Sequence, residues 1–75
     1  MKKFEFENMI LNAPKGATHY KRRERSVIFY RDIDLEHGSY SSVMWWTGDS
    51  EPFREWYTRR SFLNMNNVIE MGDTK

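Results

Sequence analysis

The chain has 75 residues, which is enough for one domain covering residues 1–75 and leaves no room for a linker. It has no cysteine, which excludes disulfide bonds and thiolate metal sites, and its 12 Lys and Arg residues nearly balance 11 Asp and Glu residues. This balance excludes an acidic mimic of DNA and gives no overall attraction toward nucleic acid, while an aromatic content of 16% supplies large rings for a small core.

The first predicted element covers residues 4–11. Residues 4–7 alternate apolar and charged side chains, and three apolar residues follow at 9–11. Alternation with a period of two favours a strand or irregular structure here over one turn of helix. Pro14 should end this element, and Gly16 should then form a tight turn in which its φ is positive.

Three strands with turn residues between them follow. They are predicted at residues 18–22, 26–33 and 40–46, with turns near Glu24 and Gly38. The middle strand is rich in β-branched and aromatic residues and is apolar on both faces, which is typical of a central strand. We therefore predict a three-stranded antiparallel meander over residues 18–46.

The C-terminal third of the chain has two interpretations. Residues 53–60 have aromatic side chains at helical spacing with Ser50 as a candidate cap, whereas residues 55–59 have the composition of a strand. We favour the strand. A loop or a short helical turn over residues 61–67 and a closing strand at residues 68–71 should follow it.

The predicted fold is mainly β. It is a single small domain with a twisted antiparallel sheet. The sequence also allows one short helix near the C-terminal half. Arginines along residues 57–60 would protect an edge strand from pairing with other chains. The chain has no apolar run of the ~20 residues that span a bilayer. Since no apolar stretch of a signal peptide follows Lys3, we expect no membrane association.

The hairpin between the first two predicted strands is one candidate binding site. It carries four positive side chains, which are Lys21, Arg22, Arg23 and Arg25. With two nearby tyrosines, these side chains resemble a surface that grips the phosphates of nucleic acid. Glu24 and the balanced total charge favour the alternative, a solvated hairpin tip that protects a sheet edge.

The adjacent tryptophans are a second candidate. On a strand, Trp45 and Trp46 point to opposite faces, so one should enter the core while the other is exposed or covered by another segment. Tryptophan, tyrosine and arginine are enriched at the energetic centres of protein interfaces. We therefore predict a partner-binding surface formed by Trp45 or Trp46 together with Tyr57 and Arg59 or Arg60.

The two histidines are weak candidates for chemistry. His19 and His37, with acidic residues at 32–36, have the residue types of a metal or acid–base site, but local hydrogen bonds or solvent exposure account for them more simply. The sequence contains no metalloprotease helix, no phosphate-binding loop and no nucleophile elbow. We therefore expect no enzyme, no cofactor and no metal.

The sequence NAPKGATHY at residues 12–20 resembles a motif of small uncharacterised proteins of tailed bacteriophages and prophages. In those proteins a short lead precedes Ala-Pro-x-Gly-Ala-Thr-His-Tyr, and strands bearing Tyr and Trp follow, often with a closing strand that contains Ile. This order is matched here by Phe29, Tyr30, Trp56 and residues 68–70. The resemblance implies a phage-encoded accessory protein that acts in the bacterial cytoplasm, and it implies no reaction.

These features lead to one main functional hypothesis and two alternatives. The main hypothesis is a non-enzymatic phage accessory protein that binds a host bacterial protein and inhibits or redirects it, for host takeover or against a defence system. The first alternative is a small nucleic-acid-binding module that uses the basic hairpin, Arg59, Arg60 and aromatic rings. The second is a structural or oligomeric phage component, and a homodimer is compatible with each hypothesis.

Overall fold

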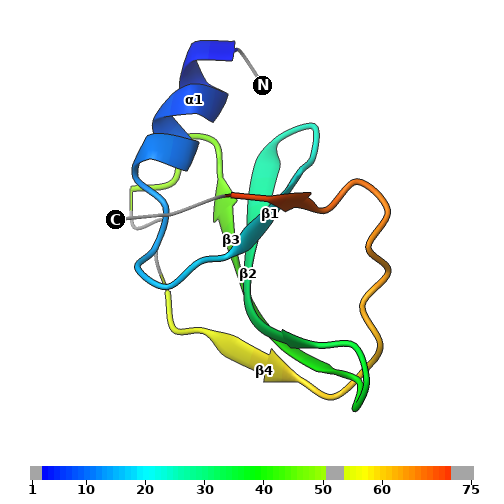
Figure 1. Cartoon of the computed structure of the whole chain (residues 1–75). Coiled ribbons are helices and arrows are strands. Elements are labelled where there is room, and N and C mark those ends of the chain that lie inside the picture. The colour runs from blue at the N-terminus through cyan, green and yellow to red at the C-terminus, as the bar shows by residue number, and fades with distance from the viewer. Residues whose placement is uncertain (1–2, 51–53, 72–75) are drawn as a thin grey trace.

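The computed structural model describes residues 3–50 and 54–71, which form one helix and five strands (Figure 1). These elements are α1 (Lys3–Leu11), β1 (His19–Arg22), β2 (Ser26–Asp34), β3 (Ser39–Trp46), β4 (Tyr57–Arg59) and β5 (Ile69–Glu70). All strand pairs are antiparallel, and the order across the sheet is β4-β3-β2-β1-β5. The prediction of a mainly β fold with an antiparallel meander over residues 18–46 is confirmed.

Two tight turns connect the strands of the meander. The β1–β2 hairpin closes with a hydrogen bond from the Arg23 amide to the Ser26 carbonyl (2.8 Å). The β2–β3 turn closes with one from the Gly38 amide to the Asp34 carbonyl (2.9 Å). Both turns lie where the sequence predicts them.

A third turn joins α1 to β1. The Ala17 amide donates to the Pro14 carbonyl (3.1 Å), and Gly16 has a φ of +93°. A positive φ at the third residue of a four-residue turn favours glycine, because a side chain there would strain the backbone. The predicted turn and the positive φ of Gly16 are therefore confirmed.

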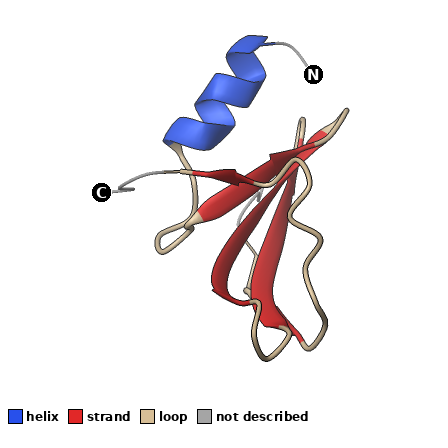
Figure 2. Ribbon diagram, turned by 45° about the vertical axis from the view of Figure 1, so that its right-hand side comes forward, coloured by secondary structure: helices blue, strands red, loops and turns tan. Residues whose placement is uncertain are grey.

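The core lies between the helix and one face of the sheet. Val27 and Phe29 of the central strand β2 have no exposed surface, and they pack with Met9 of α1, Ala17 and Val43. Figure 2 shows α1 outside the strands on one side of the sheet. The domain thus has two layers, and α1 covers one face of the sheet only.

The prediction of a strand or irregular structure over residues 4–11 is wrong, because this segment forms α1. The spacing i, i+3, i+4 places Phe6, Met9 and Ile10 on one helical face, where they contact the core. The side-chain amide of Asn12 then satisfies a backbone carbonyl of the last turn (2.8 Å). The buried side chains of this segment thus follow a helical period, although residues 4–7 alternate apolar and charged side chains as a strand would.

The C-terminal strands bear out the favoured interpretation. β4 is a strand at residues 57–59, and residues 61–67 contain no helix, so the short helix lies at the N-terminal end of the described chain instead. Phe53, part of the helical alternative, lies outside the described residues. β5 confirms the closing strand and pairs with β1. In the described ranges, no helix is long and apolar enough to cross a membrane.

Candidate functional site

The face of the sheet that points away from α1 is the candidate site. Since side chains alternate along a strand, the neighbours of buried Val27, Phe29 and Val43 point to this opposite face. The register aligns Ile28 with Met44 across β2 and β3, and Ser42 with Tyr57 across β3 and β4, so that these side chains share the face. No helix covers this face within residues 3–50 and 54–71. We call it the open face.

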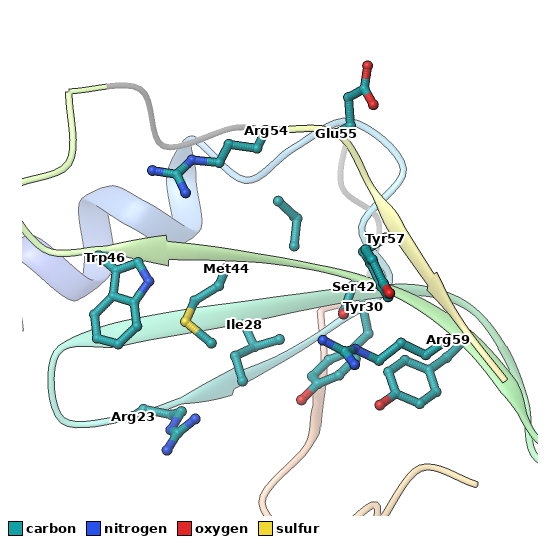
Figure 3. Close-up of a pocket in the computed structure, with 12 residues that line it drawn as sticks. Arg23, Ile28, Tyr30, Ser42, Met44, Trp46, Arg54, Glu55, Tyr57 and Arg59 are labelled. Atoms are coloured by element: carbon teal, nitrogen blue, oxygen red, sulfur yellow. The ribbon is translucent and has the colours of Figure 1, made fainter. Parts of the chain in front are cut away.

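A hollow of ≈ 430 Å³ lies on the open face (Figure 3). Its lining includes the side chains of Arg23, Ile28, Met44, Trp46, Tyr57 and Arg59. They come from β2, β3 and β4 and from the β1–β2 turn, so segments distant in the sequence build one site.

The hollow has an apolar middle and aromatic, basic ends. In Figure 3, Trp46 and Arg23 lie at one end, Tyr57 and Arg59 at the other, and the Met44 and Ile28 side chains between them. Trp46 is 48% exposed and Tyr57 is 62% exposed. Rings that remain so exposed offer flat apolar surface to a partner, whereas rings inside a core do not.

Positive charge dominates the rim of the hollow. The Arg59 guanidinium lies 4.7 Å from the centre of the Tyr57 ring, and Arg54 pairs with Asp49 at 3.8 Å. Neither Arg23 nor Arg59 forms an ion pair with any residue that the structure describes. Their charges are therefore available to an acidic group that enters the hollow.

Two tyrosines pack together at one side of the hollow. The Tyr30 and Tyr40 rings are 5.8 Å apart between centres and inclined by 59°, and Tyr30 is buried. Burial raises the pKa of Tyr30 above its usual value, the charge of ionised Tyr40 raises it further, and Arg23 acts in the opposite direction. The Tyr30 hydroxyl thus stays neutral well into the alkaline range.

Some of the residues predicted to bind a partner do come together. Trp46, Tyr57 and Arg59 line the same hollow. Trp45 points to the other face and packs against the core, and Arg60 lies outside the hollow beside the β2–β3 turn. The alternation of Trp45 and Trp46 between faces is as predicted.

The four basic residues of the hairpin do not form one patch. Arg23 lines the hollow, whereas the Arg22 guanidinium lies 4.3 Å from the Phe6 ring centre, on the face that α1 covers. Lys21 faces the open side by its register with Ile28. Arg25 lies at the hairpin tip. Only part of the predicted nucleic-acid surface therefore faces one direction.

The histidines make separate local contacts. His19 Nδ1 lies 2.8 Å from the Thr18 hydroxyl, and His37 Nδ1 lies 2.9 Å from an Asp34 carboxylate oxygen. The backbone amide of His37 also donates to Asp34, and these hydrogen bonds lower the pKa of that carboxyl group. Among the described residues, no cluster of three or more His, Asp or Glu could hold a metal ion.

Sequence reasoning did not single out the apolar middle of the hollow. Ile28 and Met44 lie on strands that were predicted correctly, so their alternation with buried neighbours was the signal that could have found them. Arg54 and Glu55 also line the hollow. They precede β4 in irregular structure, where no periodic pattern predicts which way their side chains point.

Comparison of the chain with protein-family models, with curated proteins and with solved structures returns no match in any of the three.

Proposed function

We propose that the chain is a non-enzymatic accessory protein of a tailed bacteriophage or prophage that binds a host bacterial protein through its open face. Binding inhibits or redirects that protein in the host cytoplasm, for host takeover or against a defence system. The observation that carries the proposal is the convergence of Trp46, Tyr57 and Arg59 in one hollow. The NAPKGATHY motif at residues 12–20 supports the phage setting.

The composition of the hollow suits recognition of a protein surface. Exposed aromatic rings and arginines around an apolar centre are the features of energetic centres in protein interfaces. The hollow also lies on paired strands, which hold these side chains in fixed relative positions. Binding there would cost little ordering of the backbone.

Affinity capture with matched variants tests the proposal. The tagged chain is expressed in bacteria, and captured proteins are compared between the wild type, Trp46→Ala, Tyr57→Ala and Leu11→Ala. Leu11 is an 85% exposed apolar residue on α1, so it controls for loss of exposed apolar surface outside the hollow. We expect one host protein to be lost with both hollow variants and retained with Leu11→Ala. Capture that is equal in all four samples would contradict the proposal.

Binding of nucleic acid is the second candidate function. The specific observation in its favour is that Arg23 of the basic hairpin lines the same hollow as two exposed aromatic rings, which could stack on bases. Such binding weakens steeply as salt increases, because phosphate contacts release counterions. Titration of a fluorescent single-stranded oligonucleotide at several salt concentrations distinguishes the two functions.

A further inference from the structure

The chemistry of the hollow indicates what kind of segment it binds. We propose that its occupant is an extended segment of the partner protein with the pattern acidic-x-apolar-x-acidic, a proposal that rests on the proposed function. The apolar side chain lies over Ile28 and Met44, and the two carboxylates meet Arg23 and Arg59. The pattern follows from the positions of these four side chains.

The first arginine lies level with Trp46. The Arg23 amide donates to the Ser26 carbonyl (2.8 Å), and Ser26 is the register partner of Trp46. Arg23 and Trp46 therefore mark the same end of the hollow, as Figure 3 shows.

The second arginine, Arg59 of β4, lies at the other end of the hollow. The Arg59 guanidinium reaches the Tyr57 ring, and Tyr57 is the register partner of Ser42. Ser42 and Trp46 are separated by four steps along β3, which corresponds to ~13 Å. The two ends of the hollow are therefore offset by this length along the direction of β3.

An extended peptide matches this separation. It has the same rise per residue as a strand, so its positions i and i+4 also lie ~13 Å apart. Side chains at i, i+2 and i+4 point to one face of such a peptide. Acidic residues at i and i+4 would thus reach Arg23 and Arg59 while the residue at i+2 enters the middle of the hollow.

The middle of the hollow favours a protein segment over nucleic acid. Ile28 and Met44 are directly paired across β2 and β3, and they offer aliphatic and thioether surface to an apolar side chain. The net charge of the chain is only +1, and Glu55 offsets part of the charge of the three arginines that line the hollow. Arg23 and Arg59 can match a segment with two carboxylates, whereas a polyanion with a charge on every phosphate needs a longer run of positive charge.

Defined peptides test the proposal directly. The probe is a blocked peptide of sequence Gly-Asp-Ser-Phe-Ser-Asp-Gly, titrated to millimolar concentration into the isotope-labelled full chain and followed by NMR. One comparator has Ser in place of Phe, and another has Lys in place of both Asp residues. We expect shifts at Ile28, Met44 and the Trp46 indole, with about tenfold weaker binding of each comparator.

A charge exchange identifies the arginine contact. Arg59→Glu should weaken binding of the acidic probe about tenfold and strengthen binding of the lysine comparator. Arg60→Glu is the matched control, because Arg60 is the next residue and lies outside the hollow. It should leave both affinities unchanged.

Three results would overturn the proposal. These are the absence of chemical-shift changes in the hollow, equal binding of all three peptides, and displacement of the acidic probe by a single-stranded oligothymidylate.

The capture experiment distinguishes these results from failure of the proposed function. Host-protein capture that depends on Trp46, without binding of the probe, rejects the peptide pattern alone, whereas capture independent of Trp46 rejects the binding surface itself.

Discussion

Gly16 shows how one backbone angle constrains a residue. Its φ is +93°, and a Cβ atom built there would meet only the Arg31 side chain at 3.8 Å or more, which is an ordinary contact. Space is therefore not the reason for glycine, and backbone strain is. We expect Gly16→Ala to lower the free energy of unfolding by about 1 kcal/mol or more.

Urea denaturation followed by circular dichroism measures this loss. Gly16→Asn is the useful comparator, because asparagine tolerates a positive φ better than alanine does. The asparagine variant should lose less stability than the alanine variant. Equal losses would indicate that the turn depends on something other than the backbone angle.

Burial of the Tyr30 ring makes the stability of the fold depend on pH in the alkaline range. Because burial raises its pKa in the folded state, the unfolded chain releases this proton first, at the usual pKa of 10.0. The contribution of neutral Tyr30 to stability is complete below that pH. It is lost as the pH rises through the higher pKa of the folded state.

We therefore expect the urea midpoint of the wild type to fall as the pH rises past the usual tyrosine pKa of 10.0, and the fall to be smaller in Tyr30→Phe. Tyr57→Phe provides the control, since Tyr57 is exposed on the same face. A fall of the same size in the wild type and Tyr30→Phe would show that Tyr30 is not its source.

At the scale of the elements, α1 contributes to the core through few residues. Met9 is only 3% exposed, and its side chain packs with Val27 and Phe29 of β2. Truncation of a buried Met to Ala costs about 2–5 kcal/mol. A domain of this size has only about 3–5 kcal/mol of net stability, so Met9→Ala should leave much of the chain unfolded.

Leu11→Ala is the matched control for Met9→Ala on the same helix. Leu11 is 85% exposed, so its truncation should change the free energy of unfolding by no more than about 0.5 kcal/mol. Thermal denaturation of both variants measures the difference. Comparable losses in the two variants would contradict the packing of α1 through Met9.

The elements differ in how far the sequence predicts them. β2 and β3 follow a strand period and carry β-branched and aromatic residues, and their long pairing lets local preference and tertiary structure agree. The segment that forms α1 alternates apolar and charged residues at first, and its helical period rests on only three residues, Phe6, Met9 and Ile10, which pack in or against the core. The tertiary packing therefore overrides the local period there.

The same limit applies to the candidate site. The alternation of Trp45 and Trp46 predicted that the two rings point to opposite faces and left open whether the outer ring is exposed or covered. Trp46 is the outer ring, and it is 48% exposed. Which other residues join it depends on the order of the strands across the sheet. β4 pairs with β3 over only three residues, and this pairing places Tyr57 in the hollow, while Arg60 falls outside it.

At the scale of the whole molecule, α1 lies on one face of the sheet and no helix within residues 3–50 and 54–71 covers the other, so the two faces differ. One face holds the core, and the other presents a hollow with exposed rings. The adjacent tryptophans belong to these two sides, because Trp45 packs against the core and Trp46 is 48% exposed. Substitution of each by alanine should separate folding from binding.

Trp45→Ala should cost about 3 kcal/mol of stability, because it removes a large ring from the edge of the core. Trp46→Ala should keep the fold and lose about 2–4 kcal/mol of binding free energy, as expected for an aromatic residue that contributes strongly to an interface. Circular dichroism measures the folding of both variants, and titration calorimetry measures their binding to the captured host protein. If both variants remain folded and bind like the wild type, the partner surface lies elsewhere, and the basic hairpin at residues 21–25 becomes the leading candidate.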